Sequence, residues 1–257
     1  MKNYQRSHGL RIGFLSTALW VLAAVSALVA GPPFLTDDPE PVEYRHWELY
    51  LASQLSSTNG DVSGTAPHIE VNYGLLPEVQ IHAIARFYVN SAIDSHAAYG
   101  PGDLEFGVKY RFIKESLLRP QAGIFPLIEV PTGDSSEGLG TGAVQLFLPL
   151  WLQKSFGPWT TYGGGGYQAT IGHPPENSWL FGWECQRDLS NALTIGAELF
   201  AVTKQKGYQE TEFGFNVGAI INFSPVHHVL GSVGRDIAGM NQFTCYFAYQ
   251  FTIGPAT

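Results

Sequence analysis

The sequence predicts an all-β protein, a closed antiparallel up-and-down transmembrane β-barrel of about twelve strands that follows an N-terminal signal peptide. Three observations predict this fold class. Apolar residues alternate with polar or small ones at every second position through most of the chain after residue 44. The alternating segments approach the roughly 9 to 11 residues that a tilted strand needs to cross a bilayer. Connections after every second segment are short, whereas the others are mostly longer and rich in Gly, Pro, Ser and Asp.

The chain begins with the features of a secretory signal peptide. Three basic residues within the first eleven positions precede an apolar stretch at residues 12–30, and Gly31 and two prolines follow it. We expect residues 1–30 to be removed on export, with cleavage after Ala27 or Ala30. A retained transmembrane helix is the alternative, because the apolar stretch is near the lower limit of about 18 residues for spanning a bilayer.

Residues 31–44 form a separate acidic segment between the signal peptide and the barrel, which we assign to residues 45–257. Four prolines alternate there with the carboxylates Asp37, Asp38, Glu40 and Glu43. Two interpretations stay open for this segment. It either folds into the barrel lumen as a plug or forms a disordered periplasmic tail. As a plug, it would pair with basic residues of the strands, namely Arg86, Lys109 or Arg111.

The strands are predicted from alternation, in order along the chain. The segments are 45–56, 67–74, 79–90, 102–113, 120–130, 142–153, 159–170, 178–188, 192–203, 211–222, 228–236 and 241–253. The last segment is the clearest, because apolar side chains such as Phe243 and Phe247 occupy its odd positions from 243 on. Small or polar residues such as Thr244 and Gln250 occupy its even positions. One face of each segment is therefore suited to lipid and the other to a polar interior.

The connections distinguish a membrane barrel from a soluble sandwich or lipocalin, which alternation alone also describes. Short connections are predicted at 75–78, 154–158 and 189–191, and longer ones at 57–66, 91–101 and 131–141. Outer-membrane barrels have short periplasmic turns, and an even strand number leaves both termini periplasmic. Tryptophans near predicted strand ends fit the aromatic belt at the membrane interface, the alternative being core aromatics of a soluble barrel. These are Trp47, Trp151, Trp159, Trp179 and Trp183.

Charge and cysteine content restrict the partners. The formal net charge is −8, and loss of residues 1–30 would remove only positive charges. An acidic chain without a basic stripe excludes nucleic acid as an expected partner. Cys185 and Cys245 lie in separate predicted strands, and we expect free thiols that face outward, with a disulfide formed in the periplasm as the alternative.

Several motifs resemble the MetA-pathway phenol-degradation family of outer-membrane proteins. They are Phe34-Leu35-Thr36-Asp37-Asp38-Pro39, the strand with Trp47-Glu48-Leu49, the run from Gly102 to Tyr110, Val130-Pro131-Thr132-Gly133-Asp134, and the region from Gly182 to Glu198. The resemblance covers essentially the whole mature chain. It implies an outer-membrane barrel linked to the catabolism of aromatic compounds through uptake, and it carries no catalytic residues.

The strand phases predict a polar lumen with charges of both signs. Its pore-lining candidates are Glu48, Glu70, His82, Arg86, Glu105, Lys109, Arg111, Glu129, Glu184, Glu198 and Asn216. Such groups replace the hydration of a passing solute in a channel. For any single residue we favour the simpler interpretation, a paired ion network that fills a narrow barrel. Twelve strands lie between filled eight-stranded barrels and wide porins, so we expect a narrow or gated passage.

An enzymatic function is not expected, because no nucleophile, metal or cofactor motif is present. The adjacent His227 and His228 flank a predicted turn, and Ser135 lies in a loop without a nucleophile elbow. Residues 163–166 are four glycines that fit strand coiling or the close approach of a plug. The expected partners are outer-membrane lipid, a small-molecule solute and, during insertion, the barrel-assembly machinery; the oligomeric state stays open.

The leading functional prediction is passive or gated transport of small hydrophobic or aromatic solutes across the outer membrane of a Gram-negative bacterium. The alternatives are an outer-membrane lipid hydrolase or protease of similar size and a structural or adhesive barrel without transport. The longest predicted loops have only about ten residues, which is modest for adhesion.

Overall fold

The computed structural model describes residues 33–91, 97–171, 177–204 and 211–255. The predicted signal peptide, residues 1–30, lies outside this part of the chain. Within it, no helix is long and apolar enough to span a membrane. The described strands are β1 (Trp47–Thr58), β2 (Asp61–Leu76), β3 (Val79–Ser91), β4 (Ala98–Pro101), β5 (Leu104–Ile113), β6 (Gln121–Ile124), β7 (Leu127–Val130), β8 (Val144–Phe156), β9 (Trp159–Ile171), β10 (Ser178–Ser190), β11 (Leu193–Lys204), β12 (Glu212–Asn222), β13 (His227–Ala238) and β14 (Phe243–Ile253).

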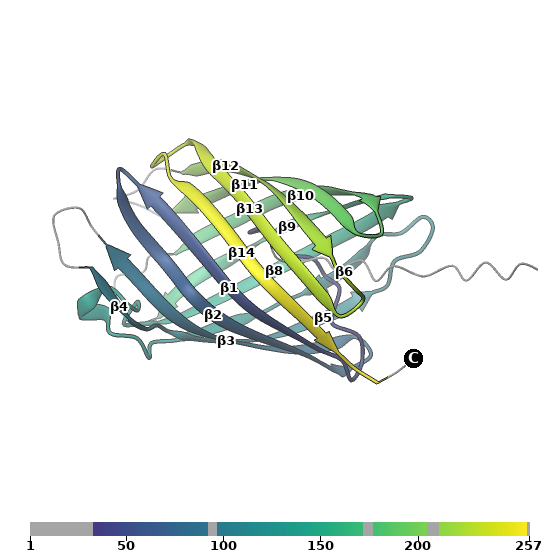
Figure 1. Ribbon diagram of the computed structural model, residues 1–257, viewed down its shortest axis with the longest axis horizontal. Helices are drawn as coiled ribbons and strands as arrows, with labels where there is room; N and C mark the ends of the chain where they lie inside the picture. The colour runs from purple at the N-terminus through teal and green to yellow at the C-terminus, as the bar shows by residue number, and fades with distance from the viewer. Residues whose placement is uncertain (1–32, 92–96, 172–176, 205–210, 256–257) are drawn as a thin grey trace, which may run out of the picture.

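The strands close into a single antiparallel barrel (Figure 1). β1 pairs with β2 on one side and with β14 on the other, so the two ends of the chain complete the ring. β4 and β5 occupy one position beside β3, and β6 and β7 occupy one position between β5 and β8. In the described chain the barrel therefore has 12 strand positions, which confirms the predicted fold class and strand number.

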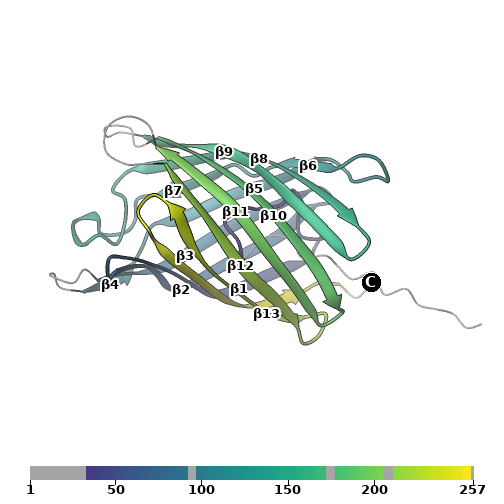
Figure 2. The same ribbon diagram turned by 90° about the horizontal axis from the view of Figure 1, so that it is seen from above.

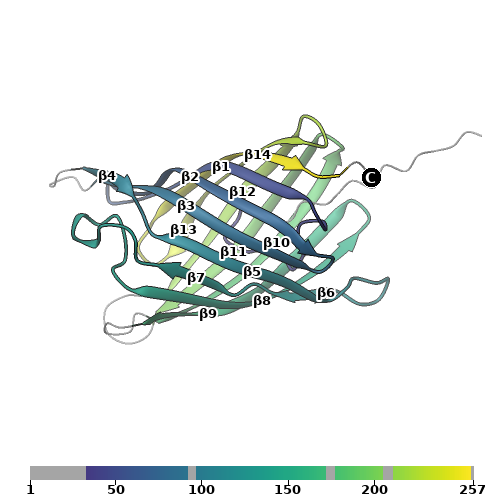
Figure 3. The same cartoon turned by 90° about the horizontal axis from the view of Figure 1, so that it is seen from below.

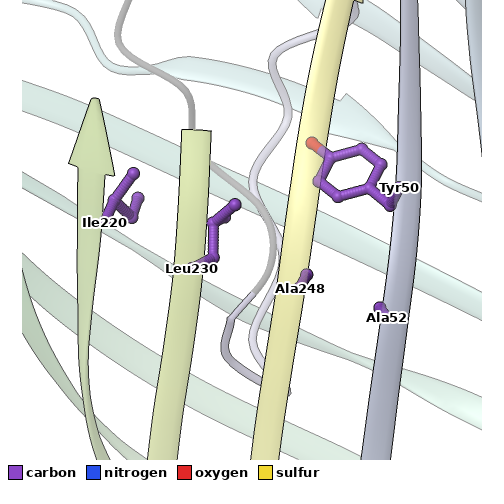
Figure 4. Close-up of a cluster of buried hydrophobic side chains, with 5 residues drawn as sticks. All are labelled: Tyr50, Ala52, Ile220, Leu230 and Ala248. Atoms are coloured by element: carbon purple, nitrogen blue, oxygen red, sulfur yellow. The ribbon is translucent and has the colours of Figure 1, made fainter. Parts of the chain in front are cut away.

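Alternation places the apolar residues outside, as the sequence predicts. On β14, Phe247 and Tyr249 are exposed on the outer surface, whereas Ala248 and Gln250 between them are wholly buried inside. Because successive side chains of a strand point to opposite faces, the same division recurs around the ring. The inner wall is not uniform. An apolar cluster covers it at β1 and β12–β14, where Figure 4 shows Tyr50, Ala52, Ile220, Leu230 and Ala248.

The two ends of the barrel differ in their connections, and we name them accordingly. The turn end carries connections 77–78, 157–158 and 191–192, and the C-terminus lies there (Figure 1). The loop end carries, among the described residues, the turn at 59–60 and the loop at 131–143. The views from above and below show the strands running obliquely from one end to the other (Figures 2 and 3).

The predicted loop at 57–66 is wrong, because β1 and β2 continue to a two-residue turn. Asn59 and Gly60 both have positive φ, 54° and 97°, as a type I′ hairpin requires. Gly64, which lies in the predicted loop, pairs with Leu55 inside β2, and a register shift opposite residues 52–54 accommodates Pro67. The Asn-Gly pair was the available signal for this turn.

The predicted interfacial position of Trp151 is also wrong. Its ring points into the barrel, where it is 1% exposed. It lies opposite Gly164 on β9, and a methyl group added to that glycine would be 3.0 Å from the Trp151 ring. The glycines at 163–166 therefore make room for aromatic side chains of neighbouring strands. Cys185 and Cys245 are free thiols, so the disulfide alternative is not formed.

Candidate functional site: the lumen and the segment that crosses it

Residues 33–42, which we call the plug segment, lie inside the barrel ahead of β1 (Figures 2 and 3). Thr36 and Asp38 at its centre are 0% exposed. At one end, Ser232 on β13 donates a hydrogen bond to the carbonyl of Pro33. At the other, the amide of Val42 donates to the Gln80 side chain on β3 at 2.8 Å. The segment therefore crosses the lumen from one wall to the other.

Glu198 on β11 holds the backbone of the plug segment. Its carboxylate accepts hydrogen bonds from the amides of Leu35 and Thr36, both at 2.8 Å, and from the Thr36 hydroxyl at 2.6 Å. Asn216 on β12 donates to the same carboxylate and fixes it from the side. Thr36 fits against the wall because residue 182 on β10 is glycine: an added methyl group would lie 2.0 Å from the Thr36 hydroxyl.

Lys109 on β5 holds the plug segment by charge. It is 4% exposed, and its ammonium lies 3.0 Å from Asp37 and 3.6 Å from Asp38. The Phe125 ring lies 5.0 Å from the same ammonium, a cation–π contact. Burial raises the pKa of Asp38 well above its usual range, against the opposing effect of Lys109. A buried cation is stable here because carboxylates of the plug segment surround it.

Arg111, also on β5, holds the last acidic residue of the segment. Its guanidinium contacts Glu40 at 3.1 Å and Glu78, in the turn between β2 and β3, at 2.7 Å. Gln121 on β6 donates a further hydrogen bond to Glu40 at 3.0 Å. The plug segment is thus bound to β3, β5, β6, β11 and β13, which together face it from opposite sides of the ring.

The plug segment separates two sets of cavities in the barrel. At the loop end, adjoining cavities of about 490 and 310 Å³ share Leu35, Gln54, Thr65, Arg86 and Thr244, and we call them together the vestibule. At the turn end, a more open cavity of about 620 Å³ is lined by Glu40, Arg111 and residues of the β5–β6 connection. Residues 36–39 lie between these cavities and line neither.

Five further predicted residues form a connected network on the vestibule side. Arg86 contacts Glu105 at 2.7 Å and Glu129 at 2.9 Å. His82 lies 3.1 Å from the other oxygen of Glu105 and 3.6 Å from Glu70. The Arg86 guanidinium is therefore shared between carboxylates on neighbouring strands, as expected for a charge removed from water.

The structure does not bring two of the predicted residues into these groups. Glu48 accepts a hydrogen bond from Tyr50 on its own strand at 2.9 Å. Glu184 is 0% exposed, and its two oxygens have no hydrogen-bond partner in the described part of the chain. In that same part, no group of three or more His, Cys, Asp or Glu side chains is arranged to hold a metal ion.

Sequence reasoning missed the neutral residues that bind the plug segment and one buried acid. Gln80, Gln121 and Ser232 carry no charge that would single them out among other inward polar residues. Asp103 is different, because it lies in the Gly102–Tyr110 motif and is 3% exposed. It holds the loop at 131–143, which contains residues 131–134 of the Val130–Asp134 motif. The proximity of the two motifs was not visible from the sequence.

Comparison with known proteins shows the fold. The COG4313 outer membrane channel from Pseudomonas putida F1 is similar with a TM-score of 0.64 and 16% identity, over 84% of this chain and 98% of that chain. The TM-score is 0.58 for the NanC porin and 0.55 for the KdgM porin. Each has 9% identity over 79% of this chain and 98% of its own chain. The chain thus has the fold of the outer-membrane β-barrels.

Sequence comparison adds nothing to this fold assignment. No family model matches the chain, and no curated protein matches its sequence. The resemblance to the MetA-pathway phenol-degradation family therefore stays a prediction from its motifs.

Proposed function

We propose that the protein is an outer-membrane channel for small hydrophobic or aromatic solutes, and that the plug segment closes it. The observation that carries the proposal is the position of residues 36–39 between two cavities of one barrel. A solute that crosses the lumen must pass this point. Passage therefore requires the plug segment to move or leave.

The attachments of the plug segment fit a closure that can be released. They include hydrogen bonds and ion pairs to side chains and the packing of Phe34 and Pro39 against wall glycines, and the segment adds no strand to the barrel wall. The barrel wall is paired around its whole circumference without it. Because closure of the ring satisfies the backbone of every strand, the barrel keeps its shape when the segment moves.

The solute class follows from the vestibule and from the family resemblance. Leu35, Leu180 and Phe200 give the vestibule apolar surface beside its polar groups. A volume of about 490 Å³ lies within the range of roughly 300 to 1,000 Å³ of small-molecule sites. Small organic molecules with an apolar body fit these walls, and the resemblance to a family linked to phenol degradation favours aromatic ones.

Planar-bilayer recording on the refolded barrel tests the proposal. We expect low or intermittent conductance from the mature chain and a higher, steadier conductance after deletion of residues 31–44. A matched control replaces the same residues with a Gly/Ser segment of equal length, which should behave like the deletion. Absence of conductance and of solute flux in all three proteins would contradict a channel function.

A further inference from the structure

The vestibule has a mouth that is built from a loop, and a single buried carboxylate holds that loop. We propose that the vestibule is the selectivity site of the channel: it takes small uncharged or cationic organic solutes, excludes anions, and has Asp103 as the positioning residue of its mouth. The proposal rests on the channel function proposed above and names the solute class of that channel.

Asp103 connects both ends of the loop at 131–143, which we call the mouth loop. One carboxylate oxygen accepts a hydrogen bond from the amide of Gly133 at 2.8 Å. The other accepts from the amide of Thr141 at 2.7 Å and from its hydroxyl at 3.0 Å. Because residues 133 and 141 are both bound to one side chain in the wall, the loop between them has a fixed base.

The mouth loop packs against the barrel wall and lines the vestibule. Leu139 is buried, and a methyl group added at Gly100 on β4 would lie 3.0 Å from its side chain. Residues 138–141 form part of the lining of the 490 Å³ cavity. The width of the opening beside Leu139 thus depends on the position of the loop, which depends on Asp103.

The charges that line the vestibule disfavour anions. Its cation, Arg86, is already bound by Glu105 and Glu129, so it offers little to an incoming carboxylate or phosphate. Two further carboxylates line the same cavities, namely Glu70 and Asp103. With Glu105 and Glu129, the described lining thus holds four carboxylates against the Arg86 guanidinium. In a cleft with low-dielectric walls, such an excess raises the local concentration of cations and lowers that of anions.

Thiol modification inside the vestibule tests charge selection without requiring passage through the barrel. Thr244 lines both cavities, and Thr244→Cys is nearly isosteric. The test compares the rates at which a cationic, an uncharged and an anionic methanethiosulfonate modify this cysteine. The background variant carries Cys185→Ser and Cys245→Ser. Asn191→Cys, exposed at the turn end, supplies the reference rates.

At Thr244→Cys we expect the cationic reagent to react faster than the anionic one by about tenfold or more, after each rate is divided by the rate of the same reagent at Asn191→Cys. The ratio should fall as salt is raised and in Glu129→Gln, which removes one lining charge. A normalised ratio of one or less would overturn charge selection.

A second comparison tests the mouth. A bulky trialkylammonium reagent should modify Thr244→Cys slowly relative to the small cationic reagent. Asp103→Ala should raise the ratio of the bulky to the small rate by at least about fivefold, because loss of the Asp103 charge lowers both rates alike and cancels in the ratio. Asp103→Asn, which keeps one acceptor oxygen, should give an intermediate ratio. Far-UV circular dichroism and heat-dependent gel mobility verify that the barrel is folded. Equal ratios in all three proteins would overturn the role of Asp103.

Different results would contradict the channel function and the selectivity site. Charge and size selection at Thr244→Cys without any solute flux would contradict the channel and retain a binding vestibule. Flux that is equal for benzyl alcohol, benzylamine and benzoate would retain the channel and overturn the selectivity site.

Discussion

At the scale of the residue, Glu198 is the side chain on which the closed lumen depends most directly. Its carboxylate accepts from two backbone amides and one hydroxyl of the plug segment. Lys109 and Arg111 add charge contacts to Asp37 and Glu40. The sequence identified Glu198, Lys109 and Arg111 as inward-facing, because strand phase is a local property. It left the placement of the plug segment open, because that placement depends on contacts between residues more than 70 positions apart.

Replacement of Glu198 should weaken closure. In Glu198→Ala the amides of Leu35 and Thr36 lose their acceptor, which costs roughly 1 to 3 kcal/mol for each buried group left unsatisfied. We expect the equilibrium constant for docking of the plug segment to fall by more than about tenfold, which raises the undocked population by a similar factor. The channel-open probability in planar bilayers measures this, with Glu198→Gln, which keeps one acceptor oxygen, as the milder control. An unchanged open probability in Glu198→Ala would show that the carboxylate does not hold the segment.

At the scale of the element, the strands were predicted because alternation, length and turns agree. The structure departs from the prediction where a residue type fits more than one structural position. Gly64 is a loop residue by composition, yet it lies inside β2 with φ of 142° beside a register shift. Trp151 resembles a belt residue by type, yet Gly164 opposite it leaves room for the ring inside the barrel. Such pairings between strands are not encoded in any single segment.

Glycines of the inner wall should control whether the plug segment can dock. In Gly182→Ala the new methyl group would lie 2.0 Å from the Thr36 hydroxyl and 3.0 Å from its β-carbon, so the segment must shift. The control is Gly231→Ala on the outer face of β13, where the nearest atom would be 3.5 Å away and the plug segment is out of reach. Both replacements put alanine into a strand, so a shared effect reports strand propensity alone.

We expect Gly182→Ala to raise the rate of modification of a cysteine at Thr36 by at least about tenfold, and Gly231→Ala to leave it unchanged. Thiol labelling of Thr36→Cys in the cysteine-free background measures both. Labelling at the same rate in the two alanine variants would contradict the docking of Thr36 against β10.

At the scale of the whole molecule, the lumen has two unlike walls joined by the plug segment. β1 and β12–β14 present an apolar cluster (Figure 4). On the other wall, Lys109 and Arg111 of β5 bind acids of the segment. The composition of the chain predicted an acidic barrel with few charges in total. It could not show that a chain segment ahead of the first strand supplies carboxylates to the cations of the wall.

The central claim is that the plug segment must move for solutes to pass, and a reversible lock tests it most directly. Thr36→Cys with Gly182→Cys, in the Cys185→Ser, Cys245→Ser background, places two thiols across the contact between segment and wall. The β-carbons would be 3.0 Å apart, so a shift of a few tenths of an ångström brings them into disulfide range, roughly 3.5 to 4.5 Å. Each single-cysteine variant controls for the substitutions themselves, and mass spectrometry verifies the bond.

The measurement is solute flux into proteoliposomes that contain the double variant, first oxidised and then reduced. It shows whether passage requires movement of the plug segment. We expect flux to be absent with the disulfide formed and to return when a reductant breaks it, while the single variants do not respond to the reductant. Equal flux before and after reduction would contradict the account, because the lumen would then conduct with the plug segment fixed in place.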